Sequence, residues 1–424
     1  MRRRHQWRRW ILVGVLTCGS TAVTAACSSA SGENLSTSSP PSVSPPATRP
    51  AVTDEHESSA SGADEPETTS AASATPTTAP SAGVYSHTGV GQMSPAVRDA
   101  KNYVYVPSND DGSVTVIDQA TMQIVKTYKV GRLVQHVVAS WDLTKLYATV
   151  SDSNRLVEID PMTGDKGASI QVAAPYNLYF TPDGSTAIVM AERLNRIDFY
   201  DRSTWKLRHS VDAPCKGVNH ADWSADETWF LATCEFSGEL LKVDTATGAV
   251  LGKVALPPGS MPQDVRLAPD GTKFYVADMD HGCVWIVNAD GTAVTGSIET
   301  GVGAHGIYPS RDASVMYVTN RGRTEHDVRR KSKPYDGSVS VIDPKTDTVV
   351  ATWLMPNGGS PDMGGVSADG KRLWLSGRYD SVVYVFDTTS GILIATIPVP
   401  PGPHGLAVFP QPGRYSLGHT GNYR

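Results

Sequence analysis

The sequence predicts an all-β protein folded as a seven-bladed β-propeller, and three observations support this. A turn in which Asp or Asn closes a short apolar run recurs seven times in the 424 residues. The spacings between these turns are 42, 41, 43, 44, 55 and 44 residues, close to the length of one four-stranded blade. Between the turns, apolar and polar residues alternate, which favours strands over helices. The turn residues are Asp118, Asp160, Asp201, Asp244, Asn288, Asp343 and Asp387.

Residues 1–26 predict an export signal that does not belong to the fold. Arginines precede an apolar stretch that begins at Trp10 and ends in the small residues Ala25 and Ala26, as in secretory signals. Cys27 follows directly, and the pattern resembles a bacterial lipoprotein signal in which this cysteine carries the lipid. Ordinary cleavage near Ala26 with release of the protein is the alternative, and Arg8-Arg9 resembles a twin-arginine signal. We expect an exported protein, lipid-anchored on the outer side of the cytoplasmic membrane or the cell surface.

Residues 27–84 predict a disordered stalk between the anchor and the propeller. From residue 28 to residue 82, 40 of 55 residues are Ser, Thr, Ala or Pro and none is aromatic. Such a composition buries too little apolar surface to offset the entropy of the chain. The propeller is expected from residue 85 to residue 424, including a tail that follows residue 410.

Each blade is expected to contain an inner strand, two central strands and an outer strand. The inner strands should begin near residues 136, 177, 220, 264, 305, 362 and 404, and the second strands near residues 102, 145, 186, 228, 273, 315 and 372. The first blade therefore starts with its second strand, and the last inner strand has no strand after it. The two ends of the repeat region should complete one blade together, which removes a free sheet edge.

Several segments resemble a known repeat. Tyr317-Val318-Thr319-Asn320 resembles the motif that names the YVTN-repeat propellers, and Tyr275-Val276-Ala277-Asp278 fits the same repeat. Residues 100–410 are similar to the YncE-like branch of exported bacterial proteins in this family. The resemblance implies a seven-bladed fold, and it implies little about activity.

One mouth of the central channel is expected to collect polar side chains. The starts of the inner strands all lie at the same end of the ring, since neighbouring strands are antiparallel. The residues there could bind a small polar ligand, an anion or a metal ion, or they could hold water and backbone groups in a purely structural role. We expect no defined metal and no cofactor, because the sequence contains no His-x-x-x-His or Cys-x-x-Cys spacing. The candidate ligand-binding residues are His136, Asn177, His220, Asp264, His305, Asp362 and His404.

A long loop from Arg321 to Tyr335 accounts for the 55-residue spacing. Its six Lys and Arg residues against Glu325 and Asp327 give a charge of +4, which could attract an anionic polymer or a cell-envelope protein. A solvated loop without a partner is the competing interpretation. The formal net charge of the chain, -6, gives no general reason to expect nucleic acid. The candidate partner-binding residues are Arg321, Arg323, Arg329, Arg330, Lys331 and Lys333.

The cysteines of the folded part agree with an oxidising compartment. Cys215 precedes an inner strand and Cys234 ends the second strand of the same blade, so hairpin geometry favours a disulfide between them. A pair between Cys234 and Cys283 of the next blade is the rival.

These features favour a non-enzymatic, monomeric binding or scaffold module that acts through one polar face. The alternative is a metal-assisted hydrolase of the lactonase type that recruits His220, Asp264, His305 and Asp362. No Gly-x-Ser-x-Gly or Cys-x-x-Cys-His motif supports a serine nucleophile or covalent haem.

Overall fold

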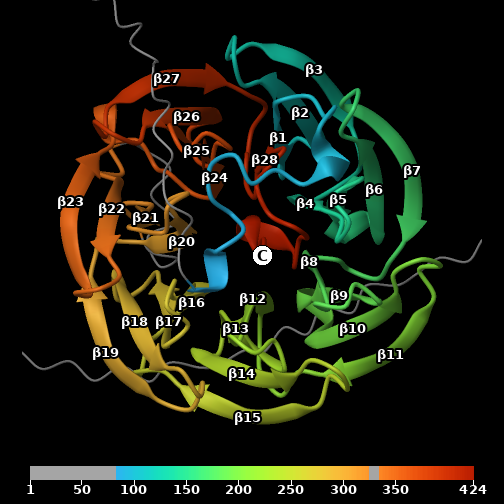
Figure 1. The fold of residues 1–424 in the computed structure, drawn as a ribbon, viewed down its shortest axis with the longest axis vertical. Helices are drawn as coiled ribbons and strands as arrows, with labels where there is room; N and C mark the ends of the chain where they lie inside the picture. Colours follow the sequence, from blue (N-terminus) through green and yellow to red (C-terminus); the bar gives the residue numbers. More distant parts are fainter. Residues whose placement is uncertain (1–82, 324–333) are drawn as a thin grey trace, which may run out of the picture. The chain divides into compact units, whose positions relative to one another are not determined.

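The computed structural model describes residues 83–323 and 334–424. In this part of the chain, seven antiparallel sheets of four strands stand around a central channel (Figure 1). The predicted seven-bladed propeller is therefore confirmed. The inner strands of the seven blades are β4 (Val134–Ala139), β8 (Asn177–Phe180), β12 (Val218–Trp223), β16 (Pro262–Leu267), β20 (Ala304–Pro309), β24 (Gly364–Val366) and β28 (Ala407–Phe409).

The other three strands of each blade follow outward from the channel. The second strands are β1 (Tyr103–Ser108), β5 (Leu146–Val150), β9 (Thr186–Ala191), β13 (Trp229–Cys234), β17 (Lys273–Asp278), β21 (Met316–Asn320) and β25 (Arg372–Gly377). The third strands are β2 (Ser113–Asp118), β6 (Arg155–Asp160), β10 (Arg196–Asp201), β14 (Glu239–Asp244), β18 (Cys283–Asn288), β22 (Ser338–Asp343) and β26 (Val382–Asp387). The outer strands are β3 (Ile124–Lys129), β7 (Asp165–Gln171), β11 (Leu207–Asp212), β15 (Val250–Ala255), β19 (Val294–Glu299), β23 (Thr348–Leu354) and β27 (Leu393–Pro398).

The repeated Asp residues close the turn between the third and outer strands. The Oδ1 of Asp118 accepts hydrogen bonds from the backbone N–H groups of Ala120 and Thr121, at 3.0 and 2.8 Å. Met122 then takes a φ of 58°, so the chain reverses within a few residues, and a bulge follows near the start of the outer strand. Asp201 makes the same bonds to Ser203 and Thr204. This short-range chemistry explains why the period is visible in the sequence.

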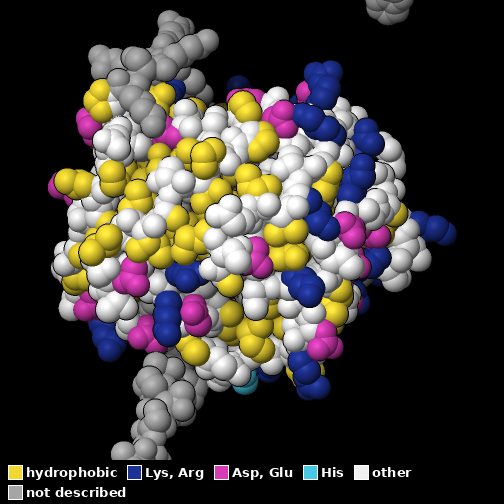
Figure 2. All heavy atoms as spheres, turned by 90° about the horizontal axis from the view of Figure 1, so that it is seen from above, with side chains coloured by type: hydrophobic (Ala, Val, Ile, Leu, Met, Phe, Trp, Pro, Cys, Tyr) yellow, Lys and Arg dark blue, Asp and Glu magenta, His cyan; other side chains and the backbone are white. Residues whose placement is uncertain are grey.

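The hydrophobic core lies between neighbouring blades. Residues of β4 and β12 are buried throughout, whereas β3 alternates between exposed and partly buried positions. Inner strands have neighbours on both faces, and outer strands face solvent on one side. Figure 2, a view at right angles to Figure 1, shows hydrophobic side chains across the middle of the visible face and Lys and Arg toward one side. No helix in the described part of the chain is long and apolar enough to cross a membrane.

The ring closes by pairing across the two ends of the repeat region. Strand β28 is antiparallel to β1, with Tyr103 opposite Phe409 and Tyr105 opposite Ala407. The Ser108 hydroxyl also donates to the carbonyl of Pro400, 3.1 Å away and 292 residues further along the chain. The expected shared blade is therefore confirmed.

Two segments outside the blades cover the end of the channel where the inner strands finish. The first contains the 3₁₀ turns η1 (Gly83–Tyr85) and η2 (Pro95–Val97), and Val84 donates to the carbonyl of Pro269. The second is residues 410–424, which we call the tail. In the tail, the carbonyl of Leu417 accepts a hydrogen bond from the N–H of Phe180 at 2.8 Å. The last turn of the tail, η7 (His419–Gly421), lies at the centre of the ring (Figure 1). The opposite mouth carries the starts of the inner strands.

Candidate functional site

Four of the predicted histidines come together inside the channel. The side chains of His136, His220, His305 and His404 are at most 1 % exposed. The centroid of the His136 ring lies 5.4 Å from that of His220 and 4.8 Å from that of His404. The ring of His305 lies 6.5 Å from His220 and 6.2 Å from His404. The structure therefore places these imidazoles in one cluster, while their role in binding stays a prediction.

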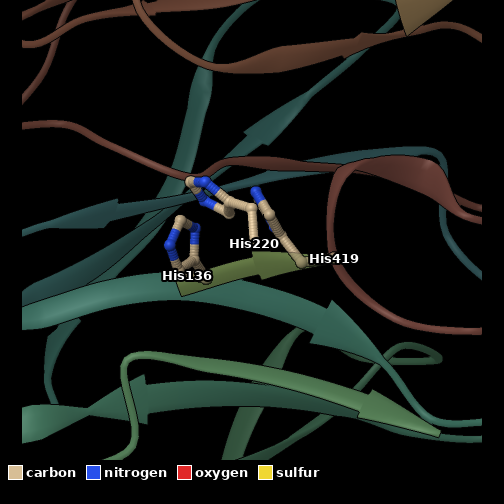
Figure 3. Close-up of side chains that lie close together, drawn as sticks. All are labelled: His136, His220 and His419. Carbon is tan, nitrogen blue, oxygen red and sulfur yellow. The ribbon is translucent and has the colours of Figure 1, made fainter. Parts of the chain in front are cut away.

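The tail adds a fifth imidazole, which the prediction did not include among the site residues. His419 in η7 is 2 % exposed, and its ring centroid lies 3.9 Å from His136 and 5.5 Å from His220. One ring nitrogen from each of these three residues lies within 4.8 Å of the other two. Figure 3 shows the three rings close together, although they belong to the separate elements β4, β12 and η7. We call His136, His220 and His419 the histidine trio.

Asp362 lies close to the other two histidines, His305 and His404, but its carboxylate is already hydrogen-bonded to an arginine. Its Oδ1 accepts from Nε and Nη2 of Arg321 at 2.8 and 2.6 Å. Arg321 Nη2 also lies 2.7 Å from His305 Nε2, and His305 Nδ1 lies 3.2 Å from Asp362 Oδ1. His404 Nε2 lies 3.7 Å from the second carboxylate oxygen. Since a guanidinium can only donate, Nε2 of His305 accepts and its Nδ1 carries the proton toward Asp362.

The remaining two predicted residues, Asn177 and Asp264, make hydrogen bonds to groups of the inner strands and, within the described residues, none to the histidines. Asn177 donates to the Tyr179 hydroxyl at 3.0 Å and accepts from the N–H of Leu178 at 2.9 Å. Asp264 accepts from the N–H of Val265 at 2.9 Å and from the N–H of Ile307 in the next blade at 3.0 Å. Asn177 thus bonds within its own strand β8, and Asp264 links the inner strands β16 and β20. Both roles correspond to the structural alternative considered for this ring of residues.

Burial keeps the channel imidazoles neutral near pH 7. Loss of solvent lowers the pKa of His220 to about 4, although its bond to the carbonyl of Gln263 opposes the shift. The pKa values of His136, His305, His404 and His419 also fall well below the usual range, and burial is the main cause in each. Neighbouring imidazoles and arginines add to the effect, because a second positive charge in the channel is unfavourable.

The open mouth of the channel contains a cavity of about 190 Å³. Two carboxylates meet there, because the Nδ2 of Asn219 lies 2.6 Å from Glu235 Oε2 and 3.5 Å from Glu192 Oε1. Loss of solvent raises the pKa of Glu192 to about 8, and the charge of Glu235 adds to the shift. We call this cavity the mouth pocket, and its lining residues are Gln135, Tyr176, Glu192, Glu235, Phe236, Gln263, His305, Arg321, Arg378 and Tyr379.

The start of the predicted partner-binding loop is buried, unlike the solvated loop of the competing interpretation, and its role in binding a partner stays a prediction. Arg321 is 4 % exposed, since its guanidinium points into the channel and bonds Asp362. Arg323 is 5 % exposed, with its guanidinium carbon 4.0 Å from the Tyr379 ring centroid. Both side chains therefore have partners within the fold. The remaining candidates, Arg329, Arg330, Lys331 and Lys333, lie outside the described residues, as does the predicted lipidation site Cys27.

The expected disulfide joins Cys215 and Cys234, whose Cα atoms are 6.0 Å apart. Cys283 is buried and is the free cysteine among the described residues, so the rival pair is not formed.

Sequence reasoning missed two residues near the channel centre. Tyr176 precedes β8, and its ring lies 5.1 Å from His136 and 5.8 Å from His220. It occupies the position next to Asn177, so an alignment displaced by one residue would have found it. His419 had no such signal, because the tail follows the last repeat and no repeat places a tail residue inside the channel.

The family model described as "YNCE-like beta-propeller" matches residues 69–414. The chain belongs to the YncE-like β-propeller family. No match was found among the curated proteins.

Among solved structures, the YncE-like chain resembles several propellers at low sequence identity. A functionally unknown protein from Desulfotomaculum acetoxidans DSM 771 has a TM-score of 0.60 and 16 % identity, covering 73 % of this chain and 99 % of that one. A putative 6-phosphogluconolactonase from Bacteroides uniformis ATCC 8492 has a TM-score of 0.58 and 17 % identity, and the match covers 72 % of this chain and 99 % of that one. The dihydro-heme d1 dehydrogenase NirN in complex with DHE has a TM-score of 0.54 and 14 % identity, and the match covers 72 % of this chain and 75 % of that one. These likenesses show the fold and not a function.

Proposed function

We propose that this YncE-like propeller is a non-enzymatic binding module, exported and lipid-anchored through Cys27, that binds a small zwitterionic ligand in the mouth pocket. The observation that carries the proposal is the pairing of two carboxylates, Glu192 and Glu235, with the guanidinium of Arg378 around one cavity. The mouth pocket therefore carries both signs of charge.

The carboxylate pair provides a site for an ammonium group. Glu192 and Glu235 share one amide group of Asn219, and their mutual repulsion contributes to the raised pKa of Glu192. A bound ammonium would relieve this repulsion and favour the ionised form of Glu192. Binding of a cationic group near pH 7 should therefore release a proton from Glu192.

Arg378 supplies the opposite charge for the ligand. Its neighbour Arg321 is already neutralised by Asp362, at 2.6 and 2.8 Å. Arg378 is partly buried, and its positive charge acts on Glu192 across the pocket. A guanidinium suits the carboxylate of a ligand, and a cavity of about 190 Å³ has the size of an amino acid rather than of a polymer. A molecule with an ammonium and a carboxylate group fits both sides of the pocket.

The hydrolase alternative has weaker support from the geometry. It would recruit Asp264, which accepts two backbone hydrogen bonds. It would also recruit His305 and Asp362, which already hold the guanidinium of Arg321. A metal ion at those two residues would have to lie against a positive charge.

The test is a calorimetric titration of the purified protein with amino acids, diamines and dicarboxylates. We expect amino acids to bind and dicarboxylates not to bind. The affinity for amino acids should increase from pH 6 to pH 8. The heat of amino-acid binding at pH 7 should depend on the ionisation enthalpy of the buffer, because the buffer takes up the proton that Glu192 releases.

Two variants and a control complete the experiment. Glu192→Gln should abolish the proton release and Arg378→Gln should weaken binding at least tenfold, whereas Glu299→Gln, on the exposed end of β19, should change neither. If no compound of the panel binds, or if both pocket variants bind as the unaltered protein does, the proposal is rejected.

A further inference from the structure

We propose that the histidine trio binds one first-row divalent transition-metal ion, such as Zn²⁺, Co²⁺ or Ni²⁺, and that this ion fastens the tail to the ring. The trio is His136 of β4, His220 of β12 and His419 of η7 (Figure 3). It shares no residue with the mouth pocket, so the two proposals stand or fall separately.

The type of ligand selects this class of metal. The trio offers three imidazole nitrogens, and imidazole suits Zn²⁺, Co²⁺, Ni²⁺ and Cu²⁺, whereas Ca²⁺ and Mg²⁺ require oxygen ligands. A metal binds the nitrogen lone pair of a neutral imidazole, and the side chains of all three residues are buried at one place in the channel.

The distances are close to those of a metal site. One ring nitrogen from each residue lies within 4.8 Å of the other two. Three nitrogens bound at about 2.0–2.1 Å to a tetrahedral zinc ion would lie roughly 3.3 Å apart. Small side-chain rotations toward the common centre would give this spacing, and a fourth position would remain for water.

Two members of the trio have nitrogen atoms without a hydrogen-bond partner in the described structure. Both ring nitrogens of His136 lack one although the side chain is fully buried. The Nδ1 of His220 contacts the carbonyl oxygen of Gln263, which can only accept, so Nδ1 carries the proton. The lone pair of His220 then lies on Nε2, which has no partner within the described residues. A bond from the second nitrogen to a backbone carbonyl is the usual support of a metal-binding histidine.

The other cluster that could hold an ion is a poorer site. His305, Asp362 and His404 also lie within 4.8 Å of one another. However, Arg321 donates to both Asp362 and His305, at 2.6 and 2.7 Å. A metal ion would have to displace this guanidinium from Asp362, and the trio presents no such obstacle.

The tail is held so that His419 reaches the other two rings. The Nδ2 of Asn422 donates to the carbonyl of Ala221 at 2.9 Å, and Arg424 donates to the carbonyls of Trp223 and Ser224 at 3.0 Å. These anchors belong to the end of β12, the strand that carries His220. An ion at the trio would therefore join the tail to both β4 and β12.

The test uses full-length, untagged protein freed of metal by a chelator and titrated with Co²⁺ and Zn²⁺. We expect one Co²⁺ per chain, visible absorption bands of four- or five-coordinate Co²⁺, loss of these bands when Zn²⁺ is added, and a higher melting temperature with Zn²⁺. Failure of the unaltered protein to bind one equivalent of either ion would overturn the proposal.

Five variants locate the ion. His136→Gln, His220→Gln and His419→Gln should each weaken Co²⁺ binding at least a hundredfold, with circular dichroism of the metal-free proteins showing whether each one is folded. His305→Gln tests the second cluster, and His87→Gln tests an exposed histidine of the segment before β1; both should bind as the unaltered protein does. Binding that survives in every folded trio variant, or that is lost in His305→Gln alone, would refute the assignment to the trio.

Discussion

Replacing Glu192 by Gln should change how the stability of the propeller depends on pH. Loss of solvent and the nearby Glu235 raise the pKa of Glu192 from the usual 4.5 to about 8. The folded state therefore favours the protonated form. The associated stability is fully present below pH 4.5 and is lost as the pH rises through 8, because the unfolded chain releases this proton earlier.

The magnitude follows from the two pKa values. One unit of pKa difference corresponds to about 1.4 kcal/mol. Between pH 6 and pH 9, Glu192 is ionised in the unfolded chain but still takes up a proton in the folded protein until the pH passes 8. The free energy of unfolding should therefore fall by about 3 kcal/mol over this range because of this residue. The side chain is partly exposed, so the figure is a ceiling. The glutamine variant does not titrate and should lack this decrease.

Urea unfolding followed by tryptophan fluorescence at pH 6, 7, 8 and 9 measures the effect. The quantity to compare is the difference between the unaltered protein and the variant at each pH, because titrations of all other groups then cancel. Glu299→Gln, an exposed glutamate on β19, is the matched control and should follow the unaltered protein. Parallel curves for the unaltered protein and Glu192→Gln would refute the reasoning that the mouth pocket disfavours an ionised carboxylate.

Three further changes test the ring and the tail. Replacing both Cys215 and Cys234 by Ser should lower the free energy of unfolding by about 3 kcal/mol in urea titrations, because the disulfide between these residues, 19 positions apart, then no longer restricts the unfolded chain. Leu417→Ala should lower it by about 2–5 kcal/mol, since this tail side chain is fully buried. Gly405→Ala should lower it by about 1–3 kcal/mol, because the added methyl group would overlap the imidazole of His136.

Each of these changes has a control in the same kind of segment. Arg414→Ala alters an exposed tail residue and should have little effect on unfolding. Gly252→Ala on the outer strand β15 meets no atom within 4 Å and should not destabilise the protein. For the disulfide, the fully reduced unaltered protein should unfold as the double serine variant does. Equal stability of Leu417→Ala and Arg414→Ala would contradict the packing described for the tail.

The fold could be predicted because its signals are local. The Asp turns, such as those at Asp118 and Asp201, use side chains that bond the next few backbone N–H groups. Such chemistry repeats in the sequence wherever the blade repeats. The shared blade followed from counting strands, and the disulfide followed from the geometry of one hairpin.

The site could be predicted only in part, because strand position does not determine what a side chain bonds. His136, His220, His305 and His404 all face the channel, as expected from the inner-strand alignment. Asn177 and Asp264 occupy equivalent positions, but their oxygen atoms accept from nearby backbone N–H groups. The path of the tail has no repeat to guide it, and so the position of His419 required the structure.

The pairing of β28 with β1 also determines when the native state can form. Ser108 and Pro400 are 292 residues apart, and contacts between such distant residues form slowly because a long loop must close first. Until that moment the backbone edge of β1 remains available to strands of other molecules. Refolding should therefore be slow and lose yield as the protein concentration rises, and a chain cut before residue 407 should self-associate through the seam it leaves open.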